Sequence, residues 1–275
     1  MDSNNKTITP EMSEIAGIFA ADGSMQKEHI CLWGNIHADR GLYDNVLKTL
    51  FLKEFDIEVR PHEKRSNSVY GFYVCNKMVI EKFRNLGFPI GKKTYSVKVP
   101  EIIYNSKNKE VMGAFIRGFF AGDGCLNFDK KRGKAQKILK IIHTYPRLQI
   151  KCVSRTLVEQ LKNMLIKIGL TSFIGEKKSK KENECTSYML EIDGAERLDR
   201  WVKEIGFSNP NHSTRYEIFK RWAFVPSNTT YAQRLSILKG ELDPWSFYPK
   251  WVRGLVWIRR QRNGNSIDSL EPSKL

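Results

Sequence analysis

The 275-residue sequence has 46 lysine and arginine residues against 30 aspartate and glutamate residues, a formal net charge of +16 at pH 7. This surplus favours a polyanionic partner, most commonly a nucleic acid, and no apolar run of about 18 residues is present to span a membrane. The five cysteines are scattered without a CxxC or Cys/His cluster, so neither a disulfide framework nor a zinc site is supported. The polar start of the sequence lacks the apolar segment of a signal peptide, and we expect an intracellular, cytoplasmic protein.

Two apolar stretches of helical length stand out along the chain. The first follows Thr9-Pro10-Glu11, where a threonine N-cap, a proline at the first helical position and an acid in the first turn start a helix. It runs to about Ala21 and ends in Asp22-Gly23. The second covers about residues 109–122 and ends in Asp123-Gly124, so the two aspartates lie 101 positions apart. This spacing predicts a duplicated domain.

Small residues four positions apart mark one face of each of these two predicted helices, which we call the motif helices. The pairs are Gly17 with Ala21 and Gly118 with Gly122. Residues four apart share a helix face, and small side chains there let two helix backbones approach closely. We therefore expect the motif helices to pack in parallel, with the two aspartates at their shared end.

Asp22 and Asp123 each precede a glycine, where helices commonly end. A carboxylate is badly placed there because the C-terminus of a helix is already partially negative. Two carboxylates brought together favour a divalent cation between them, with oxygen ligands that suit magnesium. One apolar helix ending in Asp-Gly is most often only a buried helix before a turn, but its repetition at domain-length spacing favours a metal site.

Hydrophobic periodicity predicts the remaining elements. In the first half they are a strand at 29–36, a helix at 40–55 capped by Asp39, strands at 57–63 and 69–75, and a helix at 77–86. In the second half they are a strand at 147–153, a helix at 155–168 capped by Ser154, strands at 171–177 and 186–192, and a helix at 195–205. The matching order predicts an α+β fold of two pseudo-symmetric α-β-α-β-β-α halves, packed through the motif helices and each with an antiparallel sheet.

The sequence divides into four predicted parts. They are a flexible N-terminal tail at 1–10, the first half at 11–104, the second half at 105–225 and a basic extension at 226–275. In the extension Trp245, Trp251 and Trp257 are interleaved with lysine and arginine. Such a segment either contacts nucleic acid or docks on the rest of the protein through its tryptophans.

Both motif helices resemble the LAGLIDADG motif of homing endonucleases, in the form that carries two motifs on one chain. The aspartate at the sixth position of that motif is replaced by Ala20 and Ala121, whereas the eighth-position aspartate, which carries metal in the family, is present as Asp22 and Asp123. Further phrases similar to archaeal-type members occur between about residues 11 and 238. They include Phe115-Ile116-Arg117-Gly118-Phe119-Phe120, Tyr145-Pro146-Arg147 and the run from Ile205 to His212.

The resemblance implies a site-specific double-strand DNA endonuclease that hydrolyses phosphodiester bonds within a long asymmetric target, with Mg2+ or Mn2+ as cofactor. Asp22 and Asp123 would hold the metal together with the backbone carbonyls of Ala21 and Gly122. The family also places a basic residue near each scissile phosphate. Lys151 is the first candidate for that role here, and Lys92 and Lys93 are the others. A monomer with pseudo-two-fold symmetry is expected.

The resemblance also implies that each sheet faces DNA and curves over the major groove, which a two-stranded ribbon can enter. Basic side chains on the strands and turns are then candidates for phosphate contacts and base reading. They are Arg60, His62, Lys64, Arg65, Lys130, Lys131, Arg132, Lys134, Lys177, Lys178, Lys180 and Lys181.

An alternative function keeps this fold without cleavage, as an RNA maturase that binds intron RNA or as a DNA-binding regulator. Such a protein could lose its acids, so the presence of both Asp22 and Asp123 favours the enzyme. The sequence starts at a methionine and no splicing-domain sequence flanks the motifs. We therefore expect an intron-encoded protein rather than an intein.

Overall fold

The computed structural model describes residues 8–64, 68–91, 93–131, 140–178 and 185–254. Several residues singled out from the sequence lie outside these ranges, namely Arg65, Lys92, Arg132, Lys134, Trp257, Lys180 and Lys181. Across the described ranges, none of the helices combines the length and apolar character needed to cross a membrane. Residue contacts divide the chain into two compact units, one of Met1–Leu126 with Leu148–His212 and the other of Asn127–Arg147 with Ser213–Leu275.

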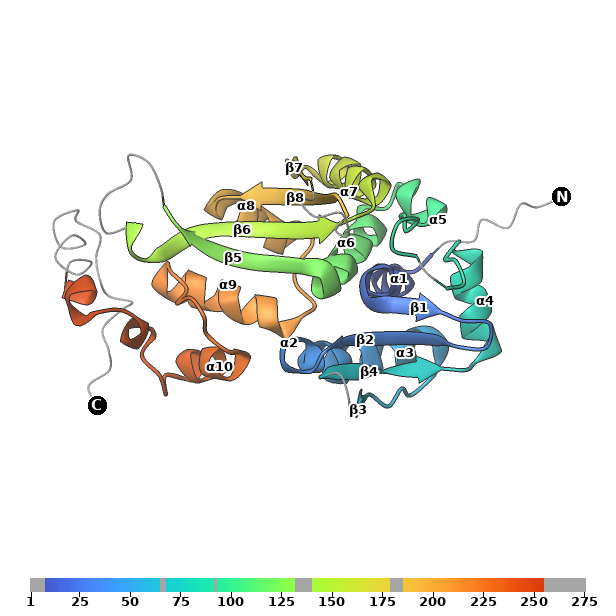
Figure 1. Ribbon diagram of the computed structural model, residues 1–275, viewed down its shortest axis with the longest axis horizontal. Coiled ribbons are helices and arrows are strands. Elements are labelled where there is room, and N and C mark those ends of the chain that lie inside the picture. The colour runs from blue at the N-terminus through green and yellow to red at the C-terminus, as the bar shows by residue number, and fades with distance from the viewer. Residues whose placement is uncertain (1–7, 65–67, 92, 132–139, 179–184, 255–275) are drawn as a thin grey trace. The chain divides into compact units, whose positions relative to one another are not determined.

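The first unit contains both motif helices. Helix α1 (Pro10–Asp22) begins as predicted, because the Thr9 side chain accepts a hydrogen bond from the Met12 amide at 3.0 Å. Helix α6 (Lys109–Asp123) is capped in the same way by Asn108. The two helices lie side by side, and both are buried along most of their length (Figure 1).

Close backbone approach between α1 and α6 depends on the predicted glycines. A Cβ atom added to Gly17 would lie 2.2 Å from the carbonyl oxygen of Phe115, and one added to Gly118 would lie 2.1 Å from that of Glu14. Glu14 and Phe115 are themselves 101 positions apart. The two contacts are therefore the same contact made twice, as a pseudo-two-fold axis between parallel helices requires.

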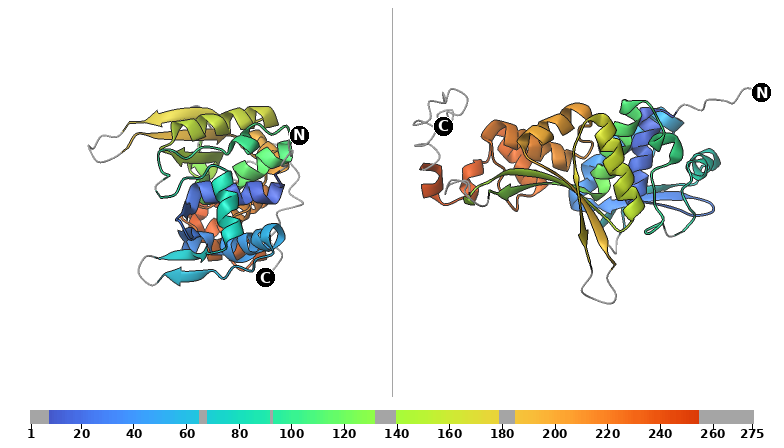
Figure 2. Two further views of the ribbon diagram at one scale, coloured as in Figure 1. Left: turned by 90° about the vertical axis from the view of Figure 1, so that its right-hand side faces the viewer. Right: turned by 90° about the horizontal axis from the view of Figure 1, so that it is seen from above.

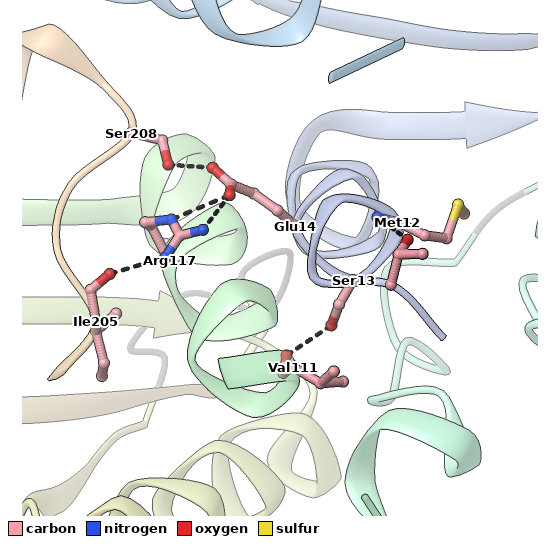
Figure 3. A network of polar contacts seen from close by, with 8 residues as sticks. Met12, Ser13, Glu14, Val111, Arg117, Ile205 and Ser208 are labelled. Atoms are coloured by element: carbon pink, nitrogen blue, oxygen red, sulfur yellow. Dashed lines mark hydrogen bonds and ion pairs between the residues drawn. The ribbon is translucent and has the colours of Figure 1, made fainter. Parts of the chain in front are cut away.

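A polar network also joins the motif helices, and it is not repeated (Figure 3). Glu14, which is 5% exposed, forms an ion pair with Arg117 and accepts a hydrogen bond from the Ser208 hydroxyl. Arg117 also donates to the Ile205 carbonyl at 3.0 Å. A buried carboxylate is tolerated here because it is both paired and hydrogen-bonded.

The first sheet follows α1 and is antiparallel, in the order β1-β2-β4-β3. Its strands are β1 (Gly23–Met25), β2 (Ile30–Asn35), β3 (His62–Lys64) and β4 (Val69–Val74). Alternate residues such as Leu32 and Phe72 are buried in the core. The opposite face carries Trp33 and Tyr73, because successive side chains of a strand point to opposite sides.

Helical segments complete the first half. They are α2 (Ile36–Gly41), the π-helix η1 (Leu42–Leu47), α3 (Lys48–Phe55), α4 (Lys77–Asn85) and the short α5 (Glu101–Tyr104). The predicted cap of the long helix at Asp39 is wrong, because the helix begins four residues earlier. Asn35 is the N-cap and its side chain accepts from the amides of His37 and Ala38.

The second sheet has the order β5-β6-β8-β7. Its strands are β5 (Gly124–Lys130), β6 (His143–Cys152), β7 (Phe173–Lys177) and β8 (Ser187–Asp193), and β7 and β8 run side by side as a two-stranded ribbon (Figure 2). Helix α7 (Arg155–Ile168) has the predicted bounds, with Ser154 as its N-cap and Gly169 in the left-handed region at its end. Helix α8 (Ala195–Glu204) follows β8.

The α+β architecture with two sheets is confirmed, and each half contains one strand more than the predicted order. The extra strands, β1 and β5, begin at the glycine that follows each motif aspartate. The second unit contains α10 (Tyr231–Lys239), the 3-10 helix η3 (Pro244–Phe247) and most of α9 (Pro210–Trp222). Within it Trp245 packs on Phe224 with ring centroids 4.2 Å apart, whereas Trp251 is 56% exposed.

Candidate metal and nuclease site

The two motif aspartates are the last residues of their helices. Oδ2 of Asp22 is buried and has no hydrogen-bond partner among the described residues. The same oxygen would lie 2.7 Å from a Cβ atom added to Gly122, so the Asp22 carboxyl group rests against the backbone of the opposite helix. Any side chain at position 122 would collide with it. The parallel packing predicted from the glycine pairs therefore brings Asp22 to the end of α6.

Desolvation disfavours the ionised form of both aspartates, and like charge adds to this at Asp22. Desolvation raises the pKa of Asp22 to about 7, with further increases from Asp123 and Asp39 and a smaller opposing effect of Lys93. Desolvation also raises the pKa of Asp123, again opposed by Lys93. A bound divalent cation would reverse this cost, because an opposite charge close by favours the carboxylate form.

The side chain of Lys93 contacts the end of α1. Its ammonium group donates to the carbonyl oxygens of Ala20 at 2.7 Å and Ala21 at 3.0 Å. A cation is well placed there, since the C-terminus of a helix carries partial negative charge. Burial lowers the pKa of Lys93, and Asp123 and then Asp22 act in the opposite direction. Lys151, the first candidate from the sequence, is an exposed residue of β6, and its catalytic role stays a prediction.

The end of α6 is held by different chemistry, which sequence reasoning did not find. The side-chain amide of Asn209 donates to the Ala121 carbonyl at 3.0 Å and to Asp39 Oδ1 at 2.8 Å. Oδ2 of Asp39 accepts from the Asn35 amide at 2.8 Å. Asn209 is 1% exposed. Its presence in the Ser208-Asn209-Pro210 phrase was the only signal available, because its partners lie far away in the sequence.

The donor set fits a hard divalent cation. The available atoms are carboxylate and carbonyl oxygens, which Mg2+ and Mn2+ accept. Oδ2 of Asp22, which has no hydrogen-bond partner among the described residues, lies against the end of α6. No cluster of three or more His, Cys, Asp or Glu side chains able to bind a metal occurs in the described part of the chain. A cation held here would need backbone carbonyls as ligands beside the two aspartates. The carbonyl of Ala21 keeps a second lone pair beside its bond from Lys93.

The predicted DNA-contacting residues are spread over both sheets. His62 and Lys64 lie in β3, and the Lys64 ammonium sits 4.3 Å from the centroid of the Trp33 ring. The ring of His62 contacts those of Trp33 and Tyr73 edge to face. Sequence reasoning missed this aromatic group, in which Tyr73 is 58% exposed. The remaining described candidates are exposed residues, namely Arg60, Lys130, Lys131, Lys177 and Lys178.

Comparisons with known proteins find a matching domain model and a similar fold. Residues 110–206 match the model of the LAGLIDADG-like domain. The solved structure of the I-LtrWI LAGLIDADG homing endonuclease bound to target DNA superimposes with a TM-score of 0.51 at 15% identity, covering 94% of this chain and 99% of that one. A structure of the homing endonuclease I-DmoI gives 0.47 at 16% identity, covering 71% and 95%.

Curated relatives share a segment with this chain rather than a whole protein. A probable translation initiation factor IF-2 of Methanocaldococcus jannaschii is 31% identical over 241 residues, which are 84% of this chain and 19% of that protein. The replication factor C small subunit of the same organism is 27% identical over 207 residues, 74% of this chain and 10% of that protein. The chain thus spans less than a fifth of the length of either.

These findings define the class of protein. Residues 110–206 carry a LAGLIDADG-like domain, and the fold of the chain is similar to that of a LAGLIDADG homing endonuclease. The chain has two motif helices, α1 and α6, packed against each other in one polypeptide.

Proposed function

We propose that this protein is a site-specific endonuclease that cuts both strands of duplex DNA by Mg2+- or Mn2+-dependent hydrolysis. One observation carries the proposal: the two motif helices end in carboxyl groups whose pKa values are raised, one of them with a buried oxygen that has no hydrogen-bond partner among the described residues, and a lysine ammonium group lies at the same end. Keeping ionised carboxyl groups partly out of solvent at a helix end costs stability, and a purely structural role would not require that cost. The net charge of +16 suits a DNA substrate.

The residues of the candidate site would have the following roles. Asp22 and Asp123, with the carbonyls of Ala21 and Gly122, would hold the cation, which when bound lowers the pKa of water and polarises the phosphate. Lys93 keeps an ammonium group at this end of the helices and would offset charge on a phosphate oxygen. The exposed basic residues of the two sheets would hold the DNA backbone.

Two features support a long, asymmetric target and a monomeric enzyme. The outer face of the first sheet presents the aromatic group of Trp33, His62 and Tyr73. The second sheet presents Gln149 hydrogen-bonded to Glu191. Different side chains in the two halves would read different base sequences, which supports an asymmetric target. Both motif helices are already paired within one chain, which supports a monomer.

Cleavage of candidate DNA by the full chain tests the proposal. The first substrate is a plasmid carrying the intron-less form of the gene from which the chain comes, since we take a mobile intron as its carrier. Mg2+-dependent linearisation at one site, abolished by EDTA and by Asp22→Asn or Asp123→Asn, is expected. The control is Glu81→Gln, an exposed acid of α4, which should cut normally. Tight, sequence-specific binding of DNA or intron RNA without cleavage by the wild-type protein would replace the nuclease with a regulator or maturase.

A further inference from the structure

The outer face of the first sheet carries an aromatic group whose arrangement is set by one glycine. Strand β4 lies between β2 and β3, and Gly71 of β4 is opposite both Trp33 of β2 and His62 of β3. Residues opposite each other in a ladder present their side chains on the same face of the sheet. Trp33 and His62 therefore flank a position without a side chain, on the face away from Leu32 and Phe72 in the core.

The two rings close the gap that the glycine leaves. A Cβ atom added to Gly71 would lie 2.0 Å from the carbonyl oxygen of Leu32, so a side chain is excluded there. Strands two places apart in a sheet are separated by about 9–10 Å, yet the ring centroids of Trp33 and His62 are 5.2 Å apart. Both rings thus lean over Gly71, which is buried although it lies in the outer face. The sheet itself fixes where the rings stand.

Tyr73 and Lys64 complete this surface. Tyr73 follows Gly71 by two residues on β4 and so shares its face, and its ring centroid is 6.1 Å from that of His62. The Lys64 ammonium group lies 4.3 Å from the centroid of the Trp33 ring. Tyr73 is 58% exposed, and His62 and Lys64 are exposed as well. Exposed apolar surface of this kind is typical of a binding site.

The geometry of the rings distinguishes two kinds of nucleic-acid contact. Stacking on an unpaired base needs an open ring face, but the Lys64 ammonium group covers a face of Trp33, and the His62 ring stands at 88° to the Trp33 ring. Contact with duplex DNA needs only an apolar surface that reaches the major groove, where the C5 methyl group of thymine offers an apolar contact. The aromatic group therefore favours thymine in duplex DNA.

We propose that Trp33, His62 and Tyr73 are specificity-determining residues, which recognise thymine methyl groups in the part of the target that the first sheet contacts. The second sheet presents the hydrogen-bonded pair of Gln149 and Glu191, whose groups suit donors and acceptors on base edges. The inference rests on the proposed nuclease function, because it requires this face to meet duplex DNA, and it adds the base feature that the face reads.

The first test removes single methyl groups from the DNA. The full chain selects its tightest-bound duplexes from a randomised library in EDTA. Each thymine of the selected duplex is then replaced in turn by deoxyuridine, which lacks only the C5 methyl group. At one or more neighbouring positions Kd should rise about fourfold, the effect of losing one buried methyl contact. Equal Kd values for all thymine and deoxyuridine duplexes, or selection without a preferred thymine, would overturn the proposal.

Protein variants assign this effect to the aromatic group. In Trp33→Ala and Tyr73→Ala the thymine duplex should bind less tightly, and deoxyuridine should no longer raise Kd at one or more of the sensitive positions, because both changes remove the same contact. Tyr73→Phe should keep the effect, since it keeps the ring and removes only the hydroxyl group. If Trp33→Ala does not fold, Tyr73→Ala, at an exposed position, still decides the matter.

The matched control is Phe173→Ala, which removes an 80% exposed aromatic side chain from β7 of the second sheet. It should leave the deoxyuridine effect at the sensitive thymines unchanged. An undiminished effect in both alanine variants of the first sheet would overturn the assignment. So would a loss of single-stranded DNA binding in those variants with duplex binding intact, which would make the aromatic group a stacking surface instead.

The second test locates the contact directly. 5-Iododeoxyuridine, which carries iodine in place of the methyl group, is placed at the sensitive positions, and its complex with the full chain is irradiated. The cross-linked peptide should contain Trp33 or Tyr73, and cross-links confined to other parts of the chain would overturn the proposal.

Neither test depends on cleavage. A protein that binds with this thymine preference but never cuts removes the proposed nuclease and leaves the present inference standing. A protein that binds and cuts its target equally well with deoxyuridine in place of every thymine overturns this inference alone.

Discussion

Replacing Asp22 with asparagine should stabilise the metal-free protein while abolishing cleavage. The carboxyl group has a pKa of about 7 in the folded chain against 3.8 for an ordinary aspartate. Below pH 3.8 it is protonated in both states and has no effect. Between the two values the unfolded chain loses the proton first, so stability falls as pH rises, and the cost is complete above pH 7. At 1.36 kcal/mol per unit the full cost is about 4 kcal/mol.

Urea denaturation in EDTA at two pH values measures this effect. The Asp22→Asn variant should exceed the wild type in free energy of unfolding by about 4 kcal/mol at pH 8 and by about 2 kcal/mol at pH 5, since part of the wild-type cost is absent at the lower pH. Glu81→Gln, at an exposed position of α4, is the control and should show no such difference. A gain of the same size at both pH values would refute the reasoning, because it would show that the carboxyl group does not titrate between them.

Three further predictions test the helix interface and the core. Gly118→Ala should cost more than about 3 kcal/mol in thermal or urea unfolding, because its Cβ would lie 2.1 Å from the Glu14 carbonyl. Gly113→Ala in the same helix, with its nearest atom at 3.3 Å, should change stability by no more than about 1 kcal/mol. Arg117→Met should cost about 3–5 kcal/mol by leaving Glu14 buried without its partner; adding Glu14→Gln should recover most of the loss, and no recovery would contradict the ion-pair account. Tyr43→Phe should be neutral or stabilise by up to about 2 kcal/mol, since the buried hydroxyl has no partner among the described residues; a clear loss would reveal a missing partner.

Local signals were sufficient for α7 and insufficient for the shortest strands. The bounds of α7 follow from Ser154 before it and Gly169 after it, both of which act within one turn of the helix. Strand β1 has three residues, too few for a period-two pattern to be recognised, and it exists because Gly23–Met25 pairs with Ile30–Leu32. The sequence favoured Asp39 as the N-cap because aspartate and asparagine are both preferred at N-cap positions. In the structure the helix starts earlier, and Asn35 is its N-cap.

The candidate site was also predictable only in part. Asp22 and Asp123 could be paired from the sequence because a repeat relates them and small residues fix the packing of their helices. Lys93 and Asn209 bond to carbonyls at least 72 residues away, between positions 93 and 21 and between 209 and 121. Such contacts follow from how the connecting segments after α4 and α8 return to the motif helices, and no periodicity or spacing in the chain encodes that path.

The ion pair between Glu14 and Arg117 has a consequence for how the two halves recognise each other. The repeat counterparts are Phe115 for Glu14 and Ala16 for Arg117, so the contact that would repeat this ion pair joins two uncharged residues. Two first halves brought together would bury two acids with no base, and two second halves would bury two bases with no acid. The two sides of the interface therefore carry opposite charges, an acid on α1 and a base on α6. Separated halves should therefore assemble only as the mixed pair.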